Sequence, residues 1–166
     1  KYADLGLEYD QINVDLLNLE LAVSVGVNST KDIYKNIHKL KDFSAVERII
    51  STSRSDEEQA NKVEMFVGDC IKYINLLKDK TNSHVFEVVD KLLSYIPETQ
   101  NESFLQVVNK VADACKNNGL FEIAEKYYSI MTGIDNAEYK SFWGLRQSKL
   151  KCKTDYDLIM KNILLV

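Results

Sequence analysis

Apolar residues recur at three- and four-residue spacing along nearly the whole chain, and no alternating run is long enough to indicate a strand. The N-terminal segment has the most regular pattern, in which apolar positions step alternately by three and four residues. These positions are Tyr2, Leu5, Tyr9, Ile12, Leu16, Leu19 and Val23. Such a heptad stripe predicts a long helix, and the pattern of the whole chain predicts an all-α fold.

A second row of apolar positions widens the apolar face of this first helix. It consists of Val14, Leu17, Leu21 and Val25. A wide apolar face favours burial between other helices in a bundle over a narrow two-stranded seam. The alternative stays open that the heptad stripe is the contact surface of a homodimer or of a docking partner.

Polar segments divide the first half of the chain into further helices. Gly26 is expected to end the first helix, and residues 28–30 to cap a short second one. A third short helix is expected from Asp42 or Ser44. Ser55 and Glu58 have the spacing of a capping box, which predicts the start of a long helix there. The apolar stripe of that helix is Val63, Val67, Cys70, Ile74 and Leu77.

The second half of the chain shows the same alternation of helices and polar turns. A helix is expected from Ser83 until Pro97, and the stretch 97–103 is the clearest linker. Further helices are expected from Asn101 or Ser103 to about Lys116, and over residues 120–131. Two more are expected to begin near Glu138 and near Thr154, which is the expected cap of the last one.

One stretch, residues 117–136, has a distinctive order of residue types. A turn glycine is followed by an aromatic, a small residue, a large aromatic and an apolar-acidic pair, namely Gly119, Phe121, Ala124, Tyr128 and Ile134-Asp135. This order resembles the second helix of a tetratricopeptide repeat, whose unit is two antiparallel helices over ~34 residues. The preceding helix keeps the apolar and small positions of such a unit, but not its identities, at Val108, Val111, Ala112 and Cys115.

The resemblance implies a right-handed array of stacked helical hairpins over residues 101–166, in which the unit after Asn136 is partial. Asn136 stands where the family usually has proline, and Arg146 stands at a small-residue position. Residues 56–96 resemble a degenerate hairpin, and residues 1–96 as a whole are expected to form an N-terminal helical bundle. The stretch 142–152 is similar to segments that follow such repeats in bacterial proteins, which indicates a bacterial source.

The same resemblance places the inner face of the array on the first helix of each unit. The implied partner-binding residues are Gln106, Asn109, Asp113, Lys140, Trp143 and Gln147. They lack the Lys/Asn pattern with which some members of the family hold a terminal carboxylate, and Asp113 would repel one. Trp143 is the expected anchor, because Trp is frequent at binding hot spots. The alternative is that Trp143 packs beneath the last helix.

Charge and composition narrow the classes of partner. The chain has 21 basic and 25 acidic residues, a net charge of −4, which argues against a nucleic-acid or membrane partner. A local exception is a basic face formed by Arg146, Lys149 and Lys153 near Trp143. This face leaves open a nucleic-acid-binding function, although a solvated surface is the simpler interpretation.

The sequence contains no recognisable active site. It has no glycine-rich phosphate loop, and His38 and His84 lack neighbours at metal-ligand spacing, so no metal or cofactor is expected. We expect His38 to be a half-exposed helix residue. Cys70, Cys115 and Cys152 are odd in number and far apart, which predicts reduced, buried thiols in a cytoplasmic protein.

Three functions therefore remain open at this level. The favoured one is a non-enzymatic module that binds a peptide or protein in a helical groove. The second is a regulatory segment of a larger protein that self-associates through its first helix. The third is a nucleic-acid-binding helical domain that uses the basic C-terminal face.

Overall fold

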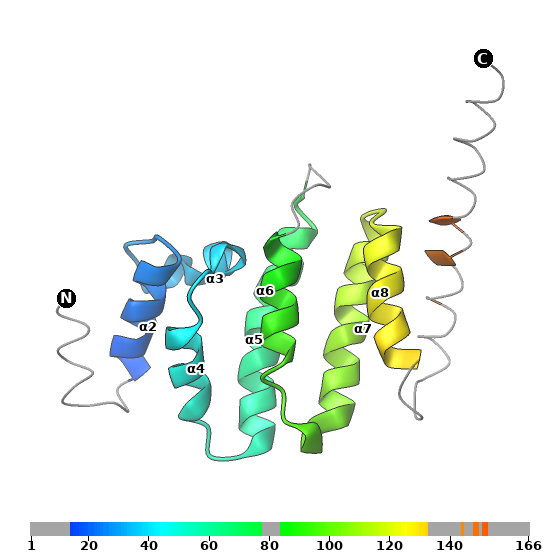
Figure 1. Cartoon of the computed structure of the whole chain (residues 1–166). Coiled ribbons are helices and arrows are strands. Elements are labelled where there is room, and N and C mark those ends of the chain that lie inside the picture. The colour runs from blue at the N-terminus through cyan, green and yellow to red at the C-terminus, as the bar shows by residue number, and fades with distance from the viewer. Residues whose placement is uncertain (1–13, 78–83, 133–143, 145–147, 150, 153–166) are drawn as a thin grey trace. The chain divides into compact units, whose positions relative to one another are not determined.

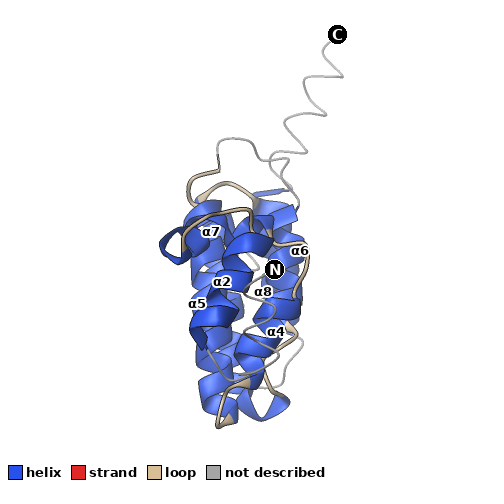
Figure 2. Cartoon of the chain, turned by 90° about the vertical axis from the view of Figure 1, so that its left-hand side faces the viewer, coloured by secondary structure: helices blue, strands red, loops and turns tan. Residues whose placement is uncertain are grey.

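The computed structural model describes residues 14–77, 84–132, 144, 148–149 and 151–152 (Figure 1). Every regular element in these ranges is a helix, and none is a strand (Figure 2). The predicted all-α fold is therefore confirmed. The chain divides into two compact units, Lys1–Phe104 and Leu105–Val166, which are described separately.

The first unit contains five α-helices and three short 3-10 helices in its described part. In chain order they are α2 (Val14–Ser24), η1 (Thr30–Asp32), α3 (Ile33–Asn36), η2 (Ile37–Lys39), α4 (Ser44–Ser51), α5 (Asp56–Ile74), α6 (His84–Leu93) and η3 (Glu98–Gln100). Helix α2 packs against α4, α5 packs against α6, and η2 contacts both α5 and α6.

Helix α2 ends where the sequence predicts. Gly26 has φ 76°, a left-handed conformation that a glycine adopts at little cost. The N–H of Val27 then donates to the carbonyl of Ala22 at 2.9 Å, which closes the helix C-terminus in a Schellman arrangement.

The face that α2 buries differs in part from the heptad stripe. Leu17 and Leu21 of the second apolar row are 0% exposed, whereas Leu19 and Val23 of the stripe are 43% and 74% exposed. The second apolar row is buried in a unit in which α2 packs against α4. Arg48 of α4 also pairs with Glu20 of α2. The stripe positions in residues 2–12 lie outside the described part.

Helix α5 begins at the predicted capping box. The Ser55 hydroxyl accepts a hydrogen bond from the N–H of Glu58 at 3.1 Å, while Glu58 reaches back to the N–H of Arg54 at 2.9 Å. The Glu58 carboxylate and the Ser55 hydroxyl thus accept hydrogen bonds from N–H groups at the start of the helix, which have no carbonyl partner within the helix. The predicted stripe faces inward: Val63, Val67, Cys70 and Ile74 are each 0% exposed.

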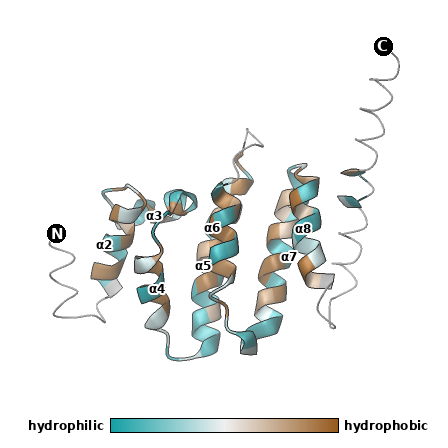
Figure 3. Ribbon diagram, in the orientation of Figure 1, coloured by the Kyte–Doolittle hydropathy of each residue, from teal (hydrophilic) through white to brown (hydrophobic). Residues whose placement is uncertain are grey.

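Polar and apolar residues follow one another along α5 and α6, as Figure 3 shows by colour. Helix α6 is the clearest case, because Val85, Val89 and Leu92 are 0% exposed. Beyond its end, the Gln59 amide of α5 donates to the carbonyl of Tyr95 at 2.8 Å. This bond fixes the chain just before Pro97, where the predicted linker begins.

The second unit is described mainly through α7 (Asn101–Asn117) and α8 (Phe121–Thr132). Gly119 has φ 75° between them, and the N–H of Leu120 donates to the carbonyl of Cys115 at 2.9 Å. The sequence predicted this turn and both helices within one residue. The helix expected from Glu138 lies outside the described residues except at five positions, and the final helix from Thr154 lies wholly outside them.

The core of the second unit contains several of the residues on which the family resemblance rests. Ala124, Tyr127 and Tyr128 of α8 are 0% exposed. The facing positions of α7 are equally inaccessible, namely Val108, Val111, Ala112 and Cys115. Small residues on both helices leave room for the two large tyrosine rings.

Candidate functional site

Three of the predicted partner-binding residues lie together on α7. Gln106, Asn109 and Asp113 follow one another at spacings of three and four, which places them on one side of the helix. Gln106 is exposed, and the other two are half-buried. Lys140, Trp143 and Gln147, the remaining members of the predicted set, lie outside the described residues.

Asp113 is the centre of this polar row. Its Oδ1 accepts a hydrogen bond from the Tyr128 hydroxyl, and its Oδ2 accepts one from the Asn109 amide at 3.2 Å. The Lys116 ammonium lies 3.4 Å from Oδ1. Burial, followed by the hydrogen bond to Asp113, raises the pKa of Tyr128, so that the hydroxyl remains a donor at any physiological pH.

The row therefore presents amide and carboxylate groups. The buried Tyr128 fixes the carboxylate of Asp113, which in turn accepts a hydrogen bond from Asn109. The Asp113 side chain remains 45% exposed and the Lys116 side chain 26% exposed, so both can reach a ligand. Such groups can hydrogen-bond the N–H and C=O groups of an extended peptide. The row contains no activated nucleophile, because its single carboxylate already has three neighbours.

The sequence did not reveal that Tyr128 orients Asp113. The spacing explained Tyr128 by packing alone, and its hydroxyl finds Asp113 only because α7 and α8 fold onto one another. A second contact was also missed. A Cβ atom on Gly144 would lie 2.8 Å from the Tyr128 Oη, so the backbone at Gly144 lies directly against the tyrosine ring.

Only one of the three residues of the predicted basic face, Lys149, belongs to the described part of the chain. Lys149 is exposed, and its Nζ lies 3.8 Å from Oε1 of Glu125 on α8. The nearby Lys151 lies over the ring of Phe121, with its Nζ 5.9 Å from the ring centroid. Arg146 and Lys153 lie outside the described residues. In the described part of the basic face, Glu125 thus partly neutralises the charge of Lys149.

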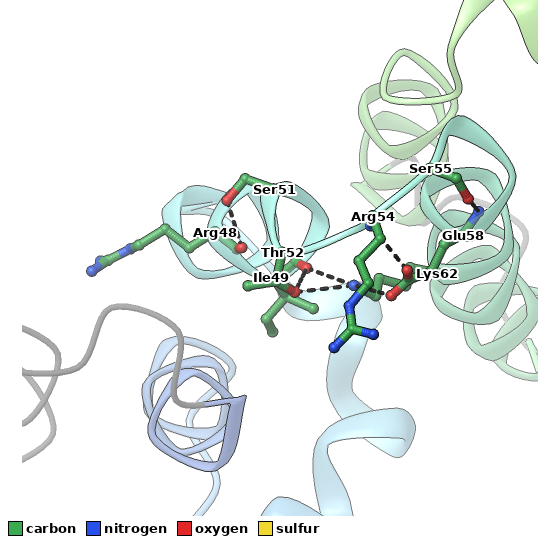
Figure 4. A network of polar contacts seen from close by, with 8 residues as sticks. All are labelled: Arg48, Ile49, Ser51, Thr52, Arg54, Ser55, Glu58 and Lys62. Atoms are coloured by element: carbon green, nitrogen blue, oxygen red, sulfur yellow. Dashed lines mark hydrogen bonds and ion pairs between the residues drawn. The ribbon is translucent and has the colours of Figure 1, made fainter.

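A further polar cluster lies in the first unit, at the corner between α4 and α5 (Figure 4). The ammonium of Lys62 lies 3.3 Å from the Ile49 carbonyl, 3.0 Å from the Thr52 hydroxyl and 3.1 Å from Oε1 of Glu58. A cation at the C-terminus of α4 complements the helix dipole. The cluster is explained by helix capping, and it joins the two helices.

The expectation of a half-exposed His38 is wrong. The residue is only 9% exposed, and its ring stacks on that of Tyr73 with centroids 3.4 Å apart and planes 5° apart. The cause is tertiary: η2 lies against α5 and α6, so a residue on a short polar segment becomes buried. The described residues contain no group of three His, Cys, Asp or Glu side chains that could bind a metal ion.

Two of the three cysteines are buried, as predicted. Burial raises the pKa of the Cys70 thiol to about 12 and that of the Cys115 thiol to about 12. Neither thiol can act as a nucleophile near neutral pH, since the thiolate is the reactive form. Cys152, in contrast, is only half-buried, which departs from the expectation of burial.

Comparisons with known protein families, with curated proteins and with solved structures found no match. Among the helices that the structure describes, none combines the length and the apolar character needed to cross a bilayer. The function is therefore inferred from the geometry of the site.

Proposed function

We propose that the second unit is a non-enzymatic protein-interaction module of the tetratricopeptide-like kind, which binds a peptide or protein segment along α7. The observation that carries the proposal is the polar row Gln106, Asn109 and Asp113, held in place by the buried hydroxyl of Tyr128. Preorganised polar groups lose little side-chain entropy when they bind, which favours affinity.

The chemistry of the row indicates the kind of segment it binds. An amide and a carboxylate suit the backbone of an extended segment and basic or hydroxyl side chains. Asp113 disfavours a terminal carboxylate. In the same proposal, Trp143 supplies an apolar anchor on the next helix, and Lys140 and Gln147 continue the row. A nucleic-acid partner is disfavoured by the net charge of −4 and by the Glu125 neighbour of Lys149.

Selection from a displayed random-peptide library tests this proposal. Peptides retained by the wild type should be lost or weakened at least tenfold by Gln106→Arg, which blocks an exposed part of the row, a loss of about 1.4 kcal/mol. Ser129→Arg, at an exposed position of α8, is the matched control and should retain them. Equal binding by both variants would refute the site.

Trp143→Ala tests the proposed anchor separately. Its circular dichroism and melting temperature must first match those of the wild type. A folded variant that loses the selected peptides would establish Trp143 as a binding residue. A variant that melts far lower would instead assign Trp143 to the core.

Self-association through α2 is a second candidate function, favoured by the exposure of Leu19 and Val23. Two apolar side chains on the same side of a helix are suited to a contact with another copy of the chain. In this proposal, the chain is a regulatory segment that dimerises through the heptad stripe.

Sedimentation equilibrium over a hundredfold range of concentration tests this second candidate. If the wild type forms a dimer, Val23→Glu should shift it to the monomer. Met65→Glu, a matched change at a 64% exposed position of α5, should leave the dimer intact. A wild type that stays monomeric throughout would rule the candidate out. In either function we place the chain in a reducing cytoplasm, which suits the free, buried thiols of Cys70 and Cys115.

A further inference from the structure

The first unit contains a histidine whose surroundings disfavour its charged form. His38 on η2 is stacked face to face on Tyr73 of α5, and its Nδ1 is buried with no hydrogen-bond partner. Protonation would put a charged N–H at a place where nothing in the described structure accepts it. An unpaired charge of this kind is costly to bury.

A second histidine, His84, lies close enough to His38 for its charge to act on it. Both ring nitrogens of His84 on α6 face acceptors: Nε2 lies 3.1 Å from the Leu40 carbonyl, and Nδ1 lies 3.1 Å from Glu87 Oε2. The Leu40 contact ties the residue that follows η2 to the start of α6.

We propose that His38 is an acid-sensitive latch that holds the segment Ile33–Leu40 against α5 and α6 near neutral pH and releases it as the pH falls. The latch is the stack of His38 on Tyr73, and the contact of His84 with the Leu40 carbonyl holds the end of the same segment in the closed form. It lies in the first unit and is independent of the proposed peptide site.

The charges around the latch act in one direction. Burial lowers the pKa of His38, and the charges of Lys39 and His84 lower it further. On the neighbouring elements, Asp69 pairs with Lys72, Asp32 pairs with Lys35, and Glu87 lies against His84. Each of these carboxylates already has a cationic or ionisable partner, so none is left to compensate a charge on His38.

The sign of the pH dependence follows from the lowered pKa. An opened segment exposes His38 to water, where it binds a proton more readily than in the closed form. The closed form is therefore fully favoured above about pH 6.5, the ordinary pKa of histidine. It loses stability as the pH falls below that value, and the loss levels off once the closed form is protonated as well.

Opening has a specific structural consequence. Ile37 and Leu40, which flank His38, are both 0% exposed in the closed form. Release of the segment would expose these side chains and the part of α5 and α6 that they cover. Acid would thus uncover an apolar surface in the first unit without unfolding α5 or α6.

Hydrogen exchange of the full chain, measured amide by amide by NMR between pH 7.5 and 5.5, tests the latch. After correction for the intrinsic pH dependence of exchange, the Leu40 amide, which bonds to the Ile37 carbonyl, should lose protection by up to about tenfold per pH unit. The amides of α5 and α6 should keep theirs.

His38→Phe is the decisive variant, because it keeps an aromatic ring for the Tyr73 stack and removes the titrating group. Protection at Leu40 should then be independent of pH. An unchanged pH dependence in this variant, or constant protection in the wild type, would overturn the proposal. Should the variant not fold, the NMR titration of His38 in the wild type decides: a pKa at or above that of an exposed histidine would also overturn it.

Discussion

The hydroxyl of Tyr128 on α8 donates its hydrogen bond to Asp113 on α7, and this bond joins the core of the second unit to its polar surface. The tyrosine is 0% exposed, whereas the Asp113 side chain that accepts this hydrogen bond is 45% exposed. One bond therefore both stabilises the helix pair and fixes the orientation of a proposed binding residue.

Tyr128→Phe should lower the free energy of unfolding by about 1–2 kcal/mol, since a hydrogen bond to a charged acceptor is lost while the ring stays in place. Urea denaturation measures this change. In a double-mutant cycle with Asp113→Ala, which removes the acceptor, the two effects should be less than additive. Fully additive effects would mean that the two side chains do not interact in solution.

Gly144→Ala should destabilise the second unit by about 1–3 kcal/mol, because the new methyl group would collide with the buried ring of Tyr128. Thermal unfolding measures the loss. Gly68→Ala provides the matched control: Gly68 lies within α5, and its added Cβ meets nothing within 4 Å. That change should raise stability by about 0.5–1 kcal/mol. Equal losses in both variants would contradict the packing at Gly144.

Lys62→Met should destabilise the first unit by about 1 kcal/mol, because it keeps the aliphatic stem but leaves the Ile49 carbonyl and the Thr52 hydroxyl without their cationic donor. The melting temperature measures the effect. Lys31→Met is a suitable control, since Lys31 is an exposed residue of η1 outside this cluster. A larger loss for the control would contradict the capping role of Lys62.

Thiol labelling of the native chain at pH 7.5 should modify Cys152 first. Burial raises the pKa of Cys70 and Cys115 to about 12, so both should react only through local or global opening. Mass spectrometry of labelled peptides distinguishes the three sites. In urea all three should react at similar rates, which serves as the control. Rapid native labelling of Cys70 would contradict its burial.

Much of the local structure of this chain follows from the sequence. The capping box at Ser55 and Glu58, the turn glycines Gly26 and Gly119 and the limits of α8 were all predicted from residue type and spacing. These features depend on groups a few residues apart, so the sequence contains their causes.

The candidate site was predictable only in part. The family resemblance singled out Gln106, Asn109 and Asp113, and their spacing then agrees with one side of α7. Neither gave a sign of the Tyr128 bond, because Asp113 and Tyr128 are separated by the turn at Gly119 and meet only when α8 packs back.

By itself, the sequence determined that the chain is helical, where several of its described helices begin or end, and which positions can be buried. Tertiary structure alone decided which of two apolar rows of α2 faces inward, and it turned His38, expected at the surface, into a buried ring on Tyr73 beside His84. The physical reason is the separation along the sequence over which each kind of interaction acts. Caps, turns and helical periodicity arise from neighbouring residues, whereas burial and the pairing of side chains depend on which elements pack together.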